Sequence, residues 1–269
     1  MGATLEFSRK NDAWALVTGA SQGIGFYTAR ALARHGYNLI LFARRKNLLA
    51  QAARTITQTY GVEAVGVPGD LRVREDIDRL LREAYTLAGG RLGVVAMSYG
   101  NPECEPCLLE EAPWQSWIEA ATLYLASTAR VLRGLLRWFK GYTRFIAYNS
   151  FTIHTPHSPL IVADAARRGL PLLLWDASHR HPERLQAVHV VLGSFRTPGA
   201  ERTVSRIAER EGYENLDKYW REKVDSLSPL GRSGVEEDVW RLIDSILSLP
   251  SYTVYTEIRL EGGSLPGPG

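Results

Sequence analysis

Short apolar and β-branched runs alternate with helical patterns along nearly all of this 269-residue chain, and this alternation limits its fold more than any other feature. Residues 13–19 have the pattern of a strand, and residues 24–36 have the spacing of a helix that ends at Gly36. Further strands are expected at 37–43, 62–70, 92–98, 143–150, 185–193 and 252–260, and further helices at 45–61, 74–90, 114–139, 161–177, 200–223 and 236–247. Alternation of this kind produces a parallel sheet with helices on both faces and right-handed crossovers. The sequence therefore predicts a Rossmann-type, doubly wound α/β fold of about seven strands.

The organisation of the chain favours one domain over residues 1–269, because no Pro/Gly/Ser-rich linker divides it. Residues 264–269 are expected to form a mobile tail. No apolar run approaches the ~18 residues that span a bilayer, and the first residues have no apolar secretory core, so a cytoplasmic protein is expected. The formal net charge of +3 gives no reason to expect nucleic acid as a partner. The excess of arginine over lysine would fit a thermophilic source.

The turn after the first predicted strand, TGASQGIGF (18–26), has the glycines of a phosphate-binding loop. Gly19 allows a sharp exit from the strand, Gly23 allows a pyrophosphate to approach the backbone, and Gly25 allows the helix to pack on the sheet. The free N–H groups at the start of the helix favour the phosphates. The spacing G-x-x-x-G-x-G differs from the commoner G-x-G-x-x-G, and a purely structural turn is the alternative. Four further residues of the turn are expected at the cofactor: Thr18, Ser21, Gln22 and Ile24.

The end of the second predicted strand indicates which cofactor would bind. An acidic residue there would bind the ribose 2′-hydroxyl of NAD, but this chain has Ala43 followed by Arg44 and Arg45. A guanidinium suits a 2′-phosphate, so NADP(H) is favoured over NAD(H), although both arginines could instead be solvated charges at a helix start. Asp70 and Leu71, after the third strand, are placed to meet the adenine.

The chain resembles the short-chain dehydrogenase/reductase family over nearly its whole length. The resemblance rests on TGASQGIG (18–25), GDL (69–71), LGSFRTP (192–198) and the C-terminal PLGRSGVEEDVWRLIDSILS and TEIRLEGG segments. It implies cofactor contacts from Gly193 and from Thr197, which would reach the nicotinamide carboxamide. It also implies a helical lid over the substrate at about 200–225. A helix over 114–139 would pack against a partner subunit in a homodimer or homotetramer, or simply belong to the core.

Members of that family transfer hydride between a nicotinamide and a carbonyl or alcohol. A serine orients the substrate, a tyrosine supplies the proton, a lysine four residues later supports the tyrosine, and a helix asparagine supports a proton relay. Here the serine is Ser150, but the tyrosine position is Val162 or Ala163, and the lysine position is Ala166 or Arg167. The asparagine position corresponds to Tyr124, and the family's NNAG reads MSYG (97–100). The resemblance is therefore to a divergent member that lacks the usual Tyr-x-x-x-Lys.

Several side chains could take over the role of proton donor. Tyr99, Tyr124 and Tyr148 are expected near the pocket, and Tyr148 shares a strand face with Ser150. The alternative for each is aromatic packing into space left by smaller residues. His154 or His157 could also serve, because histidine titrates near neutral pH. A literal Tyr-x-x-x-Lys at 219–223 lies outside the expected register and is interpreted as a helical i,i+4 pair.

Two short motifs leave the state of the cysteines open. Cys104 and Cys107 follow the fourth strand, and His154 and His157 follow the fifth. Free thiols, a disulfide, or a Cys₂His₂ zinc site are the three alternatives, and the metal site has the weakest support from spacing.

Two functions remain open at this point. The first is an NADP(H)-dependent oxidoreductase acting on a small carbonyl or alcohol with an atypical proton donor. The second is a catalytically silent NADP-binding sensor or assembly protein.

Overall fold

A computed structural model describes residues 13–154 and 159–265 of the chain. Its centre is one seven-stranded sheet in the order β3-β2-β1-β4-β5-β6-β7, and every neighbouring pair is parallel. The strands are β1 Trp14–Thr18, β2 Asn38–Ala43, β3 Ala64–Pro68, β4 Val94–Met97, β5 Thr143–Ser150, β6 Leu185–Leu192 and β7 Tyr255–Leu260. The predicted doubly wound Rossmann-type fold is confirmed.

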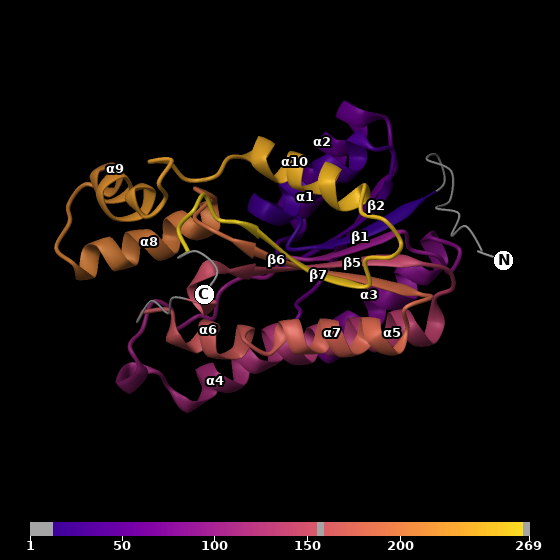
Figure 1. Ribbon diagram of the computed structural model, residues 1–269, viewed down its shortest axis with the longest axis horizontal. Helices are drawn as coiled ribbons and strands as arrows, with labels where there is room; N and C mark the ends of the chain where they lie inside the picture. The colour runs from indigo at the N-terminus through magenta and orange to yellow at the C-terminus, as the bar shows by residue number, and fades with distance from the viewer. Residues whose placement is uncertain (1–12, 155–158, 266–269) are drawn as a thin grey trace.

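Helices cover both faces of the sheet (Figure 1). The helices are α1 Gly23–Arg34, α2 Lys46–Tyr60, α3 Arg74–Leu87, α4 Trp114–Ala120, α5 Ser127–Trp138, α6 Ile161–Arg167, α7 Leu170–Arg180, α8 Pro198–Arg210, α9 Leu216–Tyr219 and α10 Glu236–Leu247. Residues of α1, α2 and α10 form one apolar cluster with the sheet, and residues of α3 to α7 form the other. Because both faces are covered, β1 and β6 are buried along their whole length, which explains their continuous apolar runs.

Three helices predicted as continuous are interrupted. The helix predicted at 114–139 has a π-helical segment, Ala121–Ala126, between α4 and α5. The helix predicted at 161–177 divides into α6 and α7 around Gly169, where an added Cβ would lie 2.8 Å from Leu125 Cδ2. The helix predicted at 200–223 divides into α8 and α9 at Gly212, whose φ of 77° is left-handed. Local periodicity predicted the helical content, but close contacts and turns set these breaks.

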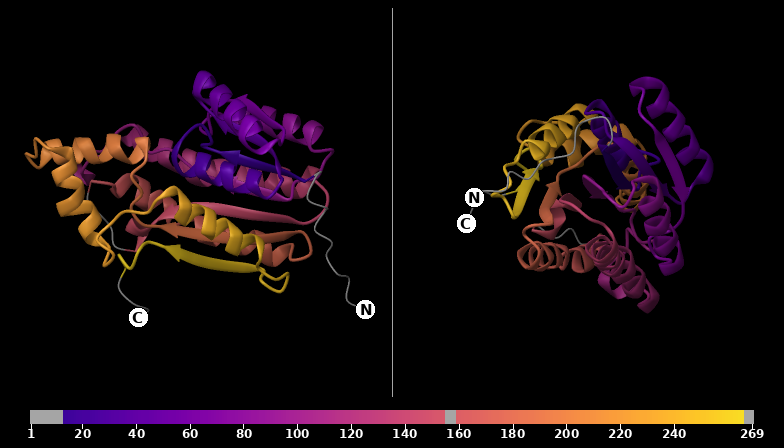
Figure 2. Two further views of the ribbon diagram at one scale, coloured as in Figure 1. Left: turned by 90° about the horizontal axis from the view of Figure 1, so that it is seen from above. Right: turned by 90° about the vertical axis from the view of Figure 1, so that its right-hand side faces the viewer.

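The segment containing α8 and α9 lies beyond the carboxyl edge of the sheet (Figure 2). Its own small cluster of buried residues includes Ile207, Ala208 and Tyr219. Near the C-terminus, Leu265 packs with Ile153 and Val191, so this residue of the predicted tail is buried. Residues 266–269 lie outside the described ones. No helix within 13–154 or 159–265 is long and apolar enough to cross a bilayer.

Candidate active site

A cleft of about 810 Å³ opens at the carboxyl edge of the sheet, where a doubly wound fold binds its ligands. This volume lies within the range of about 300–1,000 Å³ that is usual for cofactor and small-molecule sites. The lining comes from the turns after β1, β2, β3, β4, β5 and β6 and from α8. Among the predicted site residues, the cleft is lined by Gly19, Ser21, Gln22, Gly23, Ile24, Arg44, Arg45, Asp70, Leu71, Tyr99, Tyr148, Ser150, Gly193 and Thr197.

The glycine turn between β1 and α1 has no room for side chains. A Cβ on Gly19 would lie 2.8 Å from the carbonyl oxygen of Ser98, and one on Gly25 would lie 2.5 Å from that of Gly19. Gly19 and Gly23 also have left-handed φ values of 61° and 60°. Gln22 precedes α1, and its side chain makes no hydrogen bond to the N–H groups of the first turn. Gln22 therefore leaves these N–H groups free to bind a ligand. These features fit a bound diphosphate.

Thr18 and Thr197 support the turn from both sides. The Thr18 hydroxyl donates to the Ser98 carbonyl at 2.8 Å and accepts from the Ser98 N–H at 3.0 Å, which joins β1 to β4 below the cleft. Thr197 caps α8 by accepting from the N–H of Ala200 at 3.2 Å. A Cβ on Gly23 would lie 3.2 Å from Thr197 Cβ, so the segment after β6 lies directly against the glycine turn.

Charged side chains surround the part of the cleft next to β2 and β3. Arg44 and Arg45 are exposed and line the cleft. Asp70 binds the Arg72 guanidinium through both carboxylate oxygens, at 3.1 Å and 2.7 Å. Burial by itself would raise the pKa of Asp70, but the hydrogen bonds and charge of Arg72 outweigh it and hold that pKa below its usual value. Asp70 is thus an ionised carboxylate that is already engaged by a neighbouring cation.

The predicted positions of the family's tyrosine and lysine lie on α6. Val162 and Ala163 are fully buried, and both belong to the apolar cluster beneath the cleft. Arg167 lines the cleft, donates to the Tyr124 hydroxyl oxygen at 2.8 Å and to Asn101 Oδ1 at 3.0 Å, and stacks 4.7 Å from the centroid of the Tyr124 ring. The cation at the lysine position therefore contacts the side chain at the asparagine position.

The three candidate tyrosines all have internal hydrogen-bond partners. The Tyr148 hydroxyl is 2.7 Å from Thr28 Oγ1 on α1, and the Tyr99 hydroxyl is 2.6 Å from Thr128 Oγ1 on α5. Both threonine hydroxyls can donate to helix carbonyls, so each phenol is the donor to its threonine. Tyr124 donates to the carbonyl of Gly100 at 2.9 Å. Burial raises the pKa of all three phenols.

Ser150 ends β5 and begins a chain of hydroxyl contacts. Its Oγ lies 2.8 Å from Thr152 Oγ1, which lies 2.6 Å from Asp164 Oδ1. The side chain of Asp164 is 2% exposed and lies 3.8 Å from the Arg167 guanidinium. Asn149 joins the same strand end to α6 by donating to the Arg167 carbonyl at 3.1 Å. Sequence reasoning missed Thr152, Asp164 and Asn149. Two signals could have indicated them: Asp164 is adjacent to the predicted tyrosine position, and Thr152 follows Ser150 by two residues.

The cysteines and histidines do not come together in the described part of the chain. Cys104 and Cys107 are free thiols whose Sγ atoms lie 3.2 Å apart. His154 lies 3.8 Å from Glu257 of β7, and His157 is outside the described residues. Residues 13–154 and 159–265 contain no group of three or more side chains arranged to hold a metal ion.

The Tyr-x-x-x-Lys of residues 219–223 lies on the segment beyond the sheet edge. Tyr219 is buried, and its hydroxyl donates to Glu211 at 3.1 Å, while Lys223 lines the cleft. Tyr219 ends α9 and Lys223 belongs to the π-helical segment Trp220–Val224 that follows, so the pair does not belong to α6.

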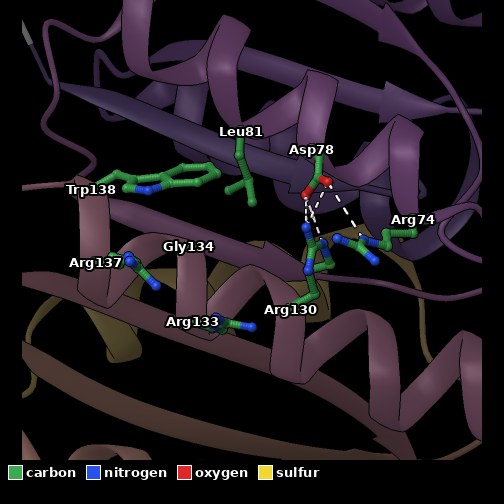
Figure 3. Close-up of a pocket in the computed structure, with 8 residues that line it drawn as sticks. All are labelled: Arg74, Asp78, Leu81, Arg130, Arg133, Gly134, Arg137 and Trp138. Atoms are coloured by element: carbon green, nitrogen blue, oxygen red, sulfur yellow. Dashed lines mark hydrogen bonds and ion pairs between the residues drawn. The ribbon is translucent and has the colours of Figure 1, made fainter.

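A second hollow lies between α3 and α5, away from the predicted site residues (Figure 3). Arg130 binds both oxygens of Asp78 at 2.6 Å, and a Cβ on Gly134 would lie 2.5 Å from Leu81 Cδ1. The lining is Arg74, Asp78, Leu81, Arg130, Arg133, Gly134, Arg137 and Trp138. None of these side chains is a predicted site residue, so this hollow marks a close helix contact rather than the candidate site.

Comparison with known proteins relates the chain to reductases. The family model described as short chain dehydrogenase matches residues 13–147. The very-long-chain 3-oxoacyl-CoA reductase of Anas platyrhynchos is 43% identical over 95 residues, which cover 34% of this chain and 30% of that protein. The peroxisomal 2,4-dienoyl-CoA reductase of Danio rerio is 28% identical over 257 residues, which cover 94% of this chain and 82% of that protein. The match to the first relative thus spans less than a third of its length.

Among solved structures, the L-sorbose reductase of Gluconobacter frateurii, complexed with NADPH and L-sorbose, superimposes with a TM-score of 0.84. The two are 20% identical, and the match covers 94% of this chain and 97% of that one, so this likeness concerns the fold. The family model, in contrast, matches the sequence itself from β1 to β5, including the glycine turn. The chain therefore belongs to the short-chain dehydrogenase family.

Proposed function

We propose that this protein is an NADP(H)-dependent oxidoreductase. It transfers hydride between the nicotinamide and a small carbonyl or alcohol substrate, and its proton donor differs from the family's tyrosine. The observation that carries the proposal is one cleft that combines the glycine turn, Arg44 and Arg45, Ser150 and Thr197. The NADPH-bound sorbose reductase with the same fold supports the choice of cofactor class.

The residues of the cleft fit a dinucleotide. The turn at Gly19 and Gly23 leaves only backbone where the diphosphate would approach. Arg44 and Arg45 would hold the 2′-phosphate, and Asp70 and Leu71 would border the adenine. Leu71 is buried, which suits contact with a base.

The substrate end of the cleft lies between β5 and the segment of α8 and α9. When bound, the reduced nicotinamide supplies the hydride. The Ser150 hydroxyl would orient the substrate oxygen, and Thr197 would position the carboxamide. The segment predicted as a lid, at about 200–225, contributes Arg202, Arg206 and Lys223 to the lining and would cover the substrate.

A catalytically silent NADP-binding protein is the second candidate. The observation that favours it is the internal hydrogen bonding of the Tyr99, Tyr124 and Tyr148 phenols. Such a protein would keep the nucleotide site and lack turnover.

One experiment separates these candidates. Calorimetric titration should show that NADPH binds at least about tenfold more tightly than NADH. NADH lacks the 2′-phosphate, and one charge-assisted hydrogen bond to that phosphate contributes about 1.5 kcal/mol. The same preparation is then assayed with NADPH and a panel of ketones, aldehydes and quinones. Turnover on any of them supports the oxidoreductase, binding without turnover supports the silent protein, and no binding of either dinucleotide refutes both.

We further propose a homodimer or homotetramer that forms through α4 and α5. Trp114 and Ile118 of α4 and Trp138 of α5 are large apolar side chains that are exposed in the single chain. Sedimentation equilibrium measures this directly, and a monomer at micromolar concentration would contradict it.

A further inference from the structure

A buried carboxyl group lies where the family's tyrosine is missing. Glu105 belongs to the loop that follows β4, and its Oε1 accepts a hydrogen bond from the N–H of Ala163 at 2.6 Å. Ala163 is one of the two predicted tyrosine positions, and it is the one that lies four residues before Arg167. Glu105 thus reaches from a distant loop to the backbone of α6 at a predicted tyrosine position.

The second oxygen of Glu105 is buried and is left without a hydrogen-bond partner among the described residues. The residue is 2% exposed, and Oε2 meets no hydrogen-bond partner in the part of the chain that the structure describes. Glu105 nevertheless lines the cleft together with Ser150 and Arg167. A buried carboxylate with one unsatisfied oxygen is costly, so the protonated form, which has an O–H to donate, is favoured.

The charges around Glu105 come from three helices, α4, α6 and α8. Burial raises its pKa to about 7, even though the Ala163 N–H and the Arg167 charge on α6 act to lower it. The negative charges of Asp164 on α6 and Glu119 on α4 raise the pKa of Glu105 further. Arg206 of α8 donates to the backbone carbonyl of Glu105 at 3.1 Å rather than to its carboxyl group. The group is therefore set to exchange a proton near neutral pH, which is where a general acid is most effective.

Glu105 and Ser150 meet the same end of α6. Asp164, the residue after Ala163, lies 2.6 Å from Thr152 Oγ1, and that atom lies 2.8 Å from Ser150 Oγ. The loop after β4 and the end of β5 are joined in this way through the first turns of α6. A substrate oxygen held by Ser150 would lie between these two segments.

We propose that Glu105 is the proton donor that replaces the family's tyrosine. This inference rests on the proposed oxidoreductase function and deepens it. In carbonyl reduction, the carbonyl carbon accepts the hydride and its electron pair, and the C=O π pair moves to the oxygen. The O–H bond of Glu105 breaks, its proton bonds to that oxygen, and the products are an alcohol, the oxidised dinucleotide and the Glu105 carboxylate. The carboxylate regains a proton from solvent, and alcohol oxidation is the reverse.

The first test is the variant Glu105→Gln, whose amide keeps the size and the acceptor for the Ala163 N–H but cannot give up a proton. We expect kcat for carbonyl reduction to fall by at least about 100-fold, because general acid catalysis contributes about 10²–10⁴-fold. The Kd for NADPH should stay within about twofold, since Glu105 does not belong to the turn that would hold the phosphates. Glu110→Gln, an exposed glutamate of the same loop, is the matched control and should leave kcat unchanged.

The second test does not depend on turnover. Infrared difference spectra of the protein carrying ¹³C-labelled glutamate, taken across pH without nucleotide, report the carboxylic C=O stretch of protonated glutamates. One glutamate should titrate near pH 7, and Glu105→Gln should remove that signal. Titration of every glutamate below about pH 5, near the ordinary value, would overturn the inference.

The outcomes also separate this inference from the proposed function. If the unsubstituted protein reduces no carbonyl, the proposed function and this inference fail together. If it does reduce one and Glu105→Gln is equally fast, only the inference fails. A loss of kcat in Tyr124→Phe with none in Glu105→Gln would assign the proton to the phenol that Arg167 contacts instead.

Discussion

Replacing both arginines after β2 should remove the preference of this protein for NADPH over NADH. Arg44 and Arg45 are exposed and line the cleft, and in the described part of the chain neither is recorded in an ion pair. A hydrogen bond to a charged group contributes about 1.5–3 kcal/mol, and exposure to solvent favours the lower figure. At about 1.5 kcal/mol each, the two guanidiniums together account for about 3 kcal/mol, which is roughly a 100-fold change in Kd.

We therefore expect Arg44→Ala/Arg45→Ala to raise the Kd for NADPH about 100-fold and to leave the Kd for NADH within about twofold. Isothermal titration calorimetry at two salt concentrations measures both, and the NADPH preference of the unsubstituted protein should shrink at high salt because the arginines are exposed. Arg54→Ala, an exposed arginine on α2, is the control. Equal weakening of NADPH and NADH, or no change in either, would refute the assignment of these arginines to the 2′-phosphate.

Three further predictions concern other parts of the cleft. Ser150→Ala should lower kcat at least about tenfold with little effect on NADPH binding; an unchanged rate would argue against its role at the substrate oxygen. Gly25→Ala forces a Cβ to 2.5 Å from the Gly19 carbonyl, so it should cost about 1–3 kcal/mol of unfolding free energy in urea and weaken NADPH binding, whereas Gly199→Ala, with 3.8 Å of clearance, should not. Glu105 binds a proton more tightly folded than unfolded, so its stabilising contribution is complete below about pH 4.5 and is lost as pH rises through about 7. Denaturation across this range should therefore show Glu105→Gln gaining stability relative to the unsubstituted protein, and a constant difference would contradict the raised pKa.

Sequence reasoning worked best where the pattern is local. Apolar runs and helical spacing predicted the order of the elements, because burial on one or both faces leaves a periodic trace in the chain itself. The glycine turn was recognisable because its spacing is local, although two of the contacts that exclude a Cβ come from distant residues, Ser98 for Gly19 and Thr197 for Gly23. The breaks at Gly169 and Gly212 were missed, since one depends on a contact with Leu125 and the other on the turn between α8 and α9.

Side-chain chemistry across the cleft was much harder to predict. Alternation along β5 predicts that Tyr148 and Ser150 share a face, but it cannot show that the phenol bonds to Thr28, 120 residues earlier. Spacing also offered a Cys₂His₂ site with His154 and His157 as the weakest of three alternatives for Cys104 and Cys107, whereas the fold leaves His154 beside Glu257.

The sequence by itself determined the doubly wound sheet and the glycine turn, and it predicted the loss of the family's tyrosine, since each of these is a pattern of neighbouring residues. Only the tertiary structure decided what stands near that missing tyrosine. Glu105 and Ala163 are 58 residues apart, and their contact exists because β4 and β5 are adjacent in the sheet and present their following segments at one edge. Burial then sets the protonation of that carboxyl group, and burial is a property of the packed molecule rather than of any stretch of the chain.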